Sequence, residues 1–352
     1  MTNINRFDYE LPTKFIAQHP LKTRDSSKLM VIHLSKNSIE HSTFNELPSF
    51  LSPSDVLVRN NTKVIPARLI AHKSTGAKLE VFLLKELTFN TWQVMIKPSK
   101  RVKQGDVLNC GTPQSSTTPI LAEITEKNIE GNTHSLTFKT SIPIQTLLSE
   151  IGNIPLPPYI EDKDFSKAKK YSDDYQNVFA KHDGAVAAPT AGRHFSNKLI
   201  RTLDNMGIGT EEITLHVGMG TFLPIKEDNI NDHIMHKESI EISTKTATNL
   251  NAAKKNGQRI IAVGTTVIRA LESSYSSQSF HPASKDTSIF IKPEDTIQSC
   301  DGLITNFHLP KSTLMCLVSA MTGYDLLMKA YKIAIENDYR FYSFGDAMLI
   351  LP

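Results

Sequence analysis

The second half of the chain alternates short apolar runs with amphipathic segments, the pattern of strands and helices in an α/β fold. Ser196 is a candidate helix cap and Gly207 a candidate stop. The apolar residues between them that share one helical face are Leu199, Ile200, Leu203 and Met206. Residues 243–257 and 326–334 show similar helical signals. Residues 152–352 are therefore predicted to form most of an α/β domain.

The preceding segment, residues 63–151, has a different texture. Short strand-like runs separated by turn residues lie at 67–71, 79–84, 92–96, 120–124 and 135–138. Such spacing predicts a small β barrel or sandwich, with helical texture returning near Pro143. The fold class predicted is α/β: a discontinuous large domain, residues 1–62 and 152–352, carrying an inserted all-β, barrel-like domain at 63–151.

Four apolar, strand-like runs end in polar or glycine-rich residues where a helix would begin. They lie at residues 184–195, 213–222, 260–272 and 302–313. In an open α/β sheet, the carboxyl ends of the strands form the crevice that binds small ligands. Glycine there lets backbone N–H groups approach an anion closely. The four junctions therefore predict one shared binding site.

The positive charge is concentrated in one region. The net charge of the 352 residues is +3, which alone does not indicate a nucleic-acid partner. Residues 63–151 hold 11 Lys and Arg against 7 Asp and Glu, or +4, and the remaining 28 against 29 give −1. The densest run contains Lys97, Lys100, Arg101 and Lys103. It is either a solvated loop or a set of phosphate contacts.

Cysteine usage and the lengths of the apolar runs bear on location. The three cysteines include no Cys-x-x-Cys pair and leave one over in any disulfide scheme, as expected in a reducing compartment. Residues 1–12 contain no apolar core of signal-peptide length, and the longest apolar run, at 314–321, is broken by serine and too short to span a membrane. We expect a soluble, cytoplasmic monomer with no membrane partner. A polar stretch at 273–279 is predicted to be a flexible loop.

The junction at Gly264 places two hydroxyls, Thr265 and Thr266, at a predicted helix start. They either cap that helix or, with its free N–H groups, bind an anion such as a carboxylate. Arg269 and Glu272, one turn apart, are either a surface pair or groups that orient a ligand.

Histidines at predicted strand ends are candidates for proton transfer, although a lone histidine there is more often a hydrogen-bonded structural residue. Gly218 and Gly220, beside His216, match a dinucleotide loop poorly because its third glycine is missing. His233, His236 and Glu238 lack a metal-ligand pattern, since a strand-like alternation follows them. No metal site is predicted.

The four junctions, with the opening residues 7–12 and the closing residues 339–348, resemble the S-adenosylmethionine:tRNA ribosyltransferase-isomerase family of queuosine biosynthesis. The resemblance runs from end to end and agrees with the predicted domain insertion. It implies a metal-free enzyme with S-adenosylmethionine as co-substrate and tRNA as partner. Such an enzyme moves the ribosyl group onto 7-aminomethyl-7-deazaguanine at the anticodon wobble position. Epoxyqueuosine-tRNA, adenine and methionine are the implied products.

The resemblance and the strand-end positions together select candidate site residues. The predicted acid/base group, for which neutral imidazoles are suited, is His194, His216, His236, Glu238, His308 and Asp346. The predicted S-adenosylmethionine contacts are Thr190, Gly218, Gly220, Thr221, Gly264, Thr265, Thr266, Arg269 and Asn306. The predicted RNA contacts are Arg24, Lys97, Lys100, Arg101 and Lys103.

Two positions depart from the family pattern. Lys28 stands where arginine is usual, which keeps the charge but not the bidentate fork, and Arg193 replaces an apolar residue. Arg193 is expected to contact RNA or point to solvent. Two other functional classes stay open: an S-adenosylmethionine-dependent tRNA methyltransferase, which the missing acidic and glycine motif disfavours, and a non-catalytic RNA-binding protein, which the clustered polar loops disfavour.

Overall fold

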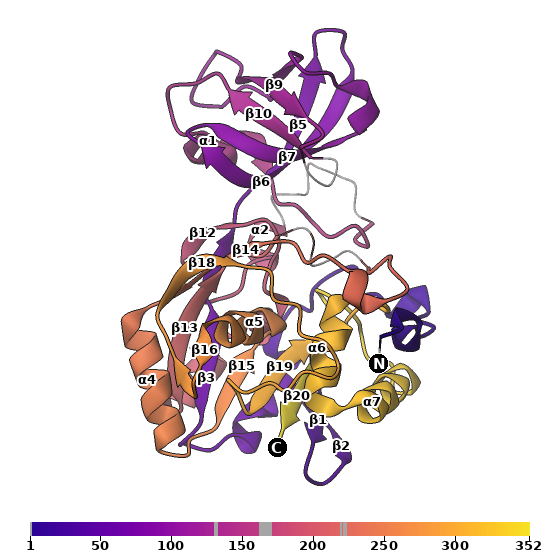
Figure 1. The fold of residues 1–352 in the computed structure, drawn as a ribbon, viewed down its shortest axis with the longest axis vertical. Coiled ribbons are helices and arrows are strands. Elements are labelled where there is room, and N and C mark those ends of the chain that lie inside the picture. Colours follow the sequence, from indigo (N-terminus) through magenta and orange to yellow (C-terminus); the bar gives the residue numbers. More distant parts are fainter. Residues whose placement is uncertain (1, 130–132, 162–170, 219, 221–223) are drawn as a thin grey trace. The chain divides into compact units, whose positions relative to one another are not determined.

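The fold is described from a computed structural model, covering residues 2–129, 133–161, 171–218, 220 and 224–352. The described chain divides into two compact units. The first comprises the chain up to Lys63, a segment beginning at Pro157, and Asp174–Pro352. The second consists mainly of Val64–Leu156. Figure 1 shows the first unit as a mixed α/β unit and the second as a β barrel.

A nine-stranded sheet forms the centre of the first unit. In spatial order its strands are β18 (Ala283–Thr287), β14 (Glu238–Ile242), β13 (Gly209–Leu215), β3 (Val56–Asn60), β15 (Ile260–Val263), β19 (Gly302–Asn306), β20 (Ala347–Leu351), β1 (Lys28–His33) and β2 (Ser38–Thr43). The central strands β13, β3, β15 and β19 are mutually parallel, so their carboxyl ends meet at one edge. β20 runs antiparallel to β19, which brings its first residue, Ala347, opposite Asn306 at the same edge.

The central strands are buried on both faces, as their continuous apolar runs require. On one face of the sheet, Leu57 of β3, Val263 of β15 and Ile304 of β19 belong to one core cluster. This cluster also contains Leu199 and Leu203 of α3 (Asn197–Asn205). The helix α5 (Thr265–Ser274) contacts β13, β3 and β15, and α6 (Thr313–Thr322) contacts α5. Figure 1 shows α5 and α6 lying over these central strands.

The predicted helix limits agree closely with the structure. Ser196 caps α3 by accepting the Leu199 N–H, and Ser243 caps α4 (Thr244–Lys255) through the Thr246 N–H. The segment at 326–334 lies in α7 (Tyr324–Glu336). The remaining short helices are α2 (Tyr171–Asp174) and the 3-10 helices η1 (Ile4–Phe7), η2 (Thr13–Phe15), η3 (Arg24–Ser26), η4 (Phe44–Phe50), η7 (Thr190–His194) and η9 (Ile230–Asp232).

The second unit is an antiparallel sheet closed on itself. Its strands are β11 (Gly152–Asn153), β5 (Arg68–Lys73), β6 (Lys78–Thr88), β7 (Thr91–Lys97), β10 (His134–Phe138), β9 (Leu121–Lys127) and β8 (Val107–Asn109). A further pairing of β5 with β8 closes the ring. The 3-10 helix η5 (Ser99–Arg101) and α1 (Ile144–Ile151) complete it. The prediction of an α/β fold with a small β barrel is thus confirmed.

Three local features differ from expectation. The apolar run at 184–195 is not a strand of the main sheet: β12 (His182–Ala185) pairs only with β4 (Thr62–Val64), and η7 follows. The polar stretch at 273–279 ends α5 and forms a hairpin of β16 (Tyr275–Ser276) and β17 (Ser279–Phe280). The barrel unit extends past residue 151 because β11 pairs with β5.

Candidate active site

A cavity opens at the carboxyl edge of the parallel strands in the first unit. Counting the open space at its mouth, it encloses about 610 Å³. Three of the predicted junctions contribute most of the lining, and the junction at 213–222 contributes Val217. The predicted residues that line it are Thr190, Gly264, Thr265, Thr266, Asn306 and His308. One cavity therefore gathers residues from the segments singled out in the sequence.

His308 is the predicted histidine that lines the cavity. Its Nε2 lies 2.9 Å from the Thr305 Oγ1, and its backbone N–H donates to the Tyr331 hydroxyl over 2.8 Å. Its backbone carbonyl accepts from the Tyr9 hydroxyl. Burial lowers the pKa of His308 to about 3, so the imidazole is neutral at pH 7. Within the described chain its Nδ1 has no protein partner.

His194 lies behind the cavity, among the buried residues. Its Nδ1 lies 2.8 Å from the Ser27 Oγ, its Nε2 lies 3.0 Å from the Asn306 Nδ2, and its ring stacks on Phe44. Burial, reinforced by the positive charge of Arg193, lowers the pKa of His194 to about 3. Its place supports Asn306 and gives it no position in the cavity lining.

We expect the neutral state of these buried imidazoles to appear in the pH dependence of stability. The folded pKa values of about 3 lie below the ordinary 6.5, so the unfolded chain binds more protons and stability is lost as pH falls. Each histidine adds a slope of up to about 1.4 kcal/mol per pH unit between roughly pH 6 and pH 5. Urea unfolding should show a shallower slope in His194→Gln, with the exposed His281→Gln as control. An unchanged slope in His194→Gln would contradict the neutral assignment.

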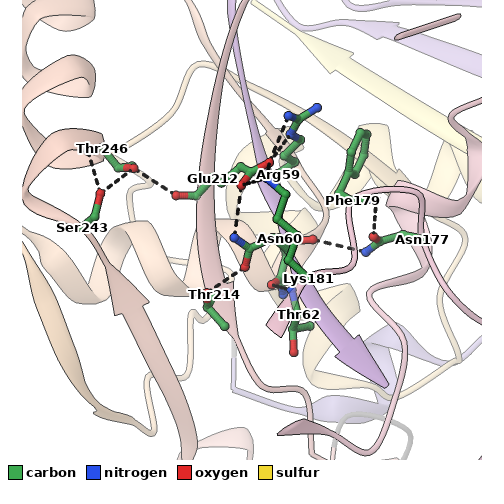
Figure 2. Close-up of polar contacts among 11 residues, drawn as sticks. Arg59, Asn60, Thr62, Asn177, Phe179, Lys181, Glu212, Thr214, Ser243 and Thr246 are labelled. Atoms are coloured by element: carbon green, nitrogen blue, oxygen red, sulfur yellow. Dashed lines mark hydrogen bonds and ion pairs between the residues drawn. The ribbon is translucent and has the colours of Figure 1, made fainter. Parts of the chain in front are cut away.

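Asn60, the last residue of β3, holds a residue of the cavity lining in place through its side-chain amide. Asn60 donates through Nδ2 to the Leu215 carbonyl over 3.0 Å and to the Thr266 Oγ1 over 3.3 Å, while its Oδ1 accepts the N–H groups of Thr62 and Leu215. Figure 2 shows Asn177, whose Nδ2 donates to the Asn60 carbonyl oxygen over 3.2 Å. Asn60 thereby ties the start of α5 to the ends of β3 and β13.

His216 directly follows β13 and is not among the residues that line the cavity, although its neighbour Val217 is. Its Nδ1 is 2.7 Å from the Thr62 Oγ1, and its ring packs so closely on Gly184 that a side chain there would meet the ring at 2.7 Å. Burial, with the nearby His182, lowers its pKa. The structure thus places His216 in a packed junction with β12.

Glu238 and Arg269 form a buried ion pair that joins β14 to α5. The Glu238 Oε1 also accepts the Gly218 N–H over 2.8 Å, so the pair holds the loop after β13. Arg269 therefore does not pair with Glu272, whose Oε1 instead accepts the N–H groups at 298 and 299. The pair couples this loop to the helix whose first residues line the cavity.

The other predicted site residues that the structure describes are not among those that line the cavity. The exposed His236 packs against Gly220, where an added Cβ would lie 2.3 Å from the ring. Thr221 lies outside the described residues. Asp346 is buried and accepts the Lys28 N–H over 3.0 Å and the Arg340 N–H over 2.7 Å. Burial raises its pKa, and its carboxylate holds backbone rather than facing the cavity.

Arg193 is buried, so its side chain neither points to solvent nor is accessible to RNA. It is 6% exposed, lies over the Phe344 ring, and donates to the carbonyl oxygens of Asp174 and Ser343, each over 2.5 Å. Burial lowers its pKa to about 10. Lys28 donates to the carbonyl oxygens at 337 and 338, just past α7. A lysine can serve that end-of-helix position because no bidentate fork is needed.

Sequence reasoning missed one wall of the cavity, formed by the aromatic rings of Tyr159 and Tyr342 together with Ser343. The two tyrosine rings lie 4.7 Å apart, and the Tyr159 hydroxyl is 2.5 Å from the Ser343 Oγ. Tyr342 has a φ of 69°, a backbone conformation uncommon for a residue with a side chain. Gly345 permits the turn, because an added Cβ would lie 2.5 Å from the Arg340 carbonyl. The sequence signal that could have indicated Tyr342 and Ser343 was the unusual composition of the closing residues 339–348.

The predicted basic run lies in the second unit. Lys97, Lys100, Arg101 and Lys103 are all exposed. The nearby Asp106 accepts from the Lys73 ammonium and from the Lys103 N–H, each over 2.7 Å, and these contacts lower the pKa of Asp106. In the first unit, Arg24 is half-buried and donates to the carbonyl at 176.

Two further searches concern the described part of the chain. No three His, Cys, Asp or Glu side chains there come together as a metal-ligand set, and His233 instead contacts Glu227 at 2.9 Å. None of the helices in the described ranges is long and apolar enough to cross a membrane.

Comparisons with known proteins bear on what the cavity serves. The family described as queuosine biosynthesis protein matches residues 4–350. An S-adenosylmethionine:tRNA ribosyltransferase-isomerase from Halothermothrix orenii is 45% identical over 350 residues, covering 99% of each chain. A relative of that name from Staphylococcus haemolyticus is 45% identical over 351 residues, covering 99% of this chain and 100% of the relative. The S-adenosylmethionine tRNA ribosyltransferase structure from Thermotoga maritima matches with a TM-score of 0.56 and 35% identity, over 98% and 100% of the two chains.

Proposed function

Because the chain belongs to the queuosine biosynthesis protein family, we propose that it transfers the ribosyl group of S-adenosylmethionine to a modified guanine in tRNA. It is an enzyme with the tRNA ribosyltransferase-isomerase role in queuosine synthesis. The acceptor proposed is 7-aminomethyl-7-deazaguanine at the anticodon wobble position. The products are epoxyqueuosine-tRNA, adenine and methionine. The observation that carries this proposal is the end-to-end family match, together with one cavity lined by its motif residues.

The start of α5 is proposed to bind the carboxylate of the methionine part. Contacts with Leu215 and Thr62 orient the Asn60 amide so that its Nδ2 donates to the Thr266 hydroxyl. The hydrogen of the Thr266 hydroxyl is therefore available to donate to a ligand. Thr265 has no hydroxyl partner within the described chain. Free N–H groups in the first helical turn and its positive dipole end favour an anion.

The reaction needs a proton to move from ribose carbon to adenine. The sulfonium acidifies the C5′–H bond. Loss of this proton breaks the C4′–O4′ bond and gives a vinyl sulfonium with a C4′=C5′ double bond, while O4′ forms a carbonyl at C1′ and expels adenine. We assign the removal of this proton to His308, which lines the cavity and is neutral at pH 7. A low pKa makes the imidazole a weak base but makes its imidazolium a strong acid, which suits return of the proton to the departing adenine. The tRNA amine then adds to C4′, and the resulting C5′ ylide attacks the C1′ carbonyl to close the carbon ring. The C1′ oxyanion displaces methionine from C5′ and forms the epoxide.

The rival methyltransferase function predicts different products from the same reagents. The protein should be incubated with S-adenosylmethionine and tRNA bearing the aminomethyl-deazaguanine, and the small molecules identified by mass. Adenine and methionine should appear in equal amounts, and a chelator should leave the rate unchanged. S-adenosylhomocysteine as the main product would establish methyl transfer. Tight tRNA binding without any turnover would indicate a non-catalytic RNA-binding protein.

We expect the change of Thr265 and Thr266 together to Val to raise the KM for S-adenosylmethionine by about 10-fold or more, because two hydrogen bonds to a charged group are lost. The affinity for tRNA should stay unchanged. Thr244→Val is the matched control, since Thr244 also begins a helix but is exposed on α4. A double variant that loses tRNA affinity but keeps its KM for S-adenosylmethionine would show that the carboxylate binds elsewhere.

A further inference from the structure

The orientation of the Asn306 amide is fixed by its buried surroundings. Its Nδ2 lies 3.2 Å from the Tyr342 carbonyl oxygen and 3.5 Å from that of Asp346. A flipped amide would place oxygen against these two carbonyl oxygens and lose the donor they require. The amide nitrogen therefore faces them, and the amide oxygen faces the Thr190 hydroxyl at 2.9 Å.

That orientation fixes the hydrogens of its neighbours. The Asn306 Nδ2 also lies 3.0 Å from the His194 Nε2, which must therefore accept. His194 then carries its hydrogen on Nδ1 and donates it to the Ser27 Oγ at 2.8 Å. On the opposite side, the Thr190 hydroxyl has to donate to the Asn306 Oδ1, because an amide oxygen cannot donate.

Thr190 is half-buried and lines the cavity, whereas the other members of this chain of hydrogen bonds are buried. Its hydrogen is committed to Asn306, so the Thr190 oxygen can offer only lone pairs to a ligand. Thr266 has the opposite polarity, because it accepts from Asn60 and keeps its hydrogen for a ligand. Two of the hydroxyls that line the cavity thus differ in polarity: that of Thr190 accepts and that of Thr266 donates.

We propose that Asn306, held by the Tyr342 and Asp346 carbonyl oxygens and by His194, sets Thr190 as an acceptor that selects an O–H or N–H donor on the nucleoside of the sulfonium substrate. This inference rests on the proposed function and adds a specificity determinant to it. The donor is a ribose hydroxyl or the exocyclic amine of adenine. His194 and Asn306 act here as positioning residues, through the direction of the Thr190 hydroxyl.

The test measures inhibition constants of S-adenosylmethionine analogues against turnover in the presence of tRNA. Fluorine replaces the ribose 2′-hydroxyl in one analogue and the 3′-hydroxyl in a second, which removes the donor, and a third carries an N6,N6-dimethyl group. Each analogue is compared between wild type, Thr190→Val, Thr190→Ser and Asn306→Ala. Comparing one analogue across enzymes cancels its intrinsic effect, and turnover of the parent substrate by wild type tests the proposed function separately.

Wild type should disfavour one of the three analogues by about 10-fold or more, since a hydrogen bond is lost and an acceptor faces an acceptor. Thr190→Ser should keep that discrimination and Thr190→Val should lose it. Asn306→Ala should also weaken it, because the freed Thr190 hydroxyl can turn and donate to fluorine or nitrogen. An active wild type that binds all three analogues like the parent would overturn the inference. Discrimination that survives in Thr190→Val would overturn it as well.

Discussion

Replacing His308 by Gln is expected to lower kcat by about 100-fold or more, the usual contribution of a positioned proton-transfer group. His308 lines the cavity, is 8% exposed and is held by Thr305 and by its own backbone contacts with Tyr331 and Tyr9. Gln can keep a hydrogen bond to Thr305 but cannot take up a proton. Single-turnover measurement of adenine release, with tRNA and S-adenosylmethionine saturating, gives the chemical step directly.

The comparison with His216→Gln decides between the two histidines at strand ends. His216 contacts Thr62 and Gly184 and lies outside the lining of the cavity, so its substitution should affect kcat far less. The fold of each variant is checked by its urea unfolding midpoint. A folded His308→Gln enzyme with near-normal kcat would remove His308 from the proton-transfer role.

Changing Lys97, Lys100, Arg101 and Lys103 to Gln is expected to weaken tRNA binding strongly and to flatten its salt dependence. All four side chains are exposed, and the neighbouring Asp106 is already paired with Lys73. Each phosphate contact contributes about 0.7 to 0.9 to the slope of log K against log salt, so four contacts would change it by roughly 3 units. Titration of labelled tRNA at several salt concentrations measures the slope.

A second quadruple variant controls for the loss of net charge. Lys198, Arg201, Lys245 and Lys255 are exposed on α3 and α4 of the first unit. Their replacement by Gln removes the same charge and should leave the slope near the parent value. Equal slopes in the two quadruple variants would show that the barrel loop makes no specific phosphate contact. Affinity for S-adenosylmethionine should stay unchanged in both.

Features set by neighbouring residues were predictable from the sequence. Helix limits depend on local hydrogen bonds and on backbone freedom, so the sequence pattern predicts them. Examples are the caps Ser196 and Ser243 and the helix end at Gly207. The short strands of the barrel followed from turn spacing. The family resemblance, confirmed by the match to residues 4–350, joined these pieces into one architecture.

Features that depend on distant parts of the chain were not predictable in this way. Glu238, predicted as an acid/base group, and Arg269, predicted as an S-adenosylmethionine contact, form an internal ion pair that exists only once β14 and α5 pack together. Arg193 is buried because distant carbonyl oxygens accept from it. Tyr342 reaches the cavity because β20 runs antiparallel to β19. No local spacing encodes these pairings.

Transfer of the ribosyl carbons is tested most directly by following them into tRNA. S-adenosylmethionine labelled with carbon-13 throughout its ribose is incubated with the protein and tRNA bearing 7-aminomethyl-7-deazaguanine, and the digested nucleosides are weighed by mass spectrometry. We expect the modified nucleoside to gain every labelled ribose carbon while unlabelled adenine and methionine are released in equal amounts. A nucleoside that gains only the methyl group, or one that gains no label while the protein binds both substrates, would contradict ribosyl transfer.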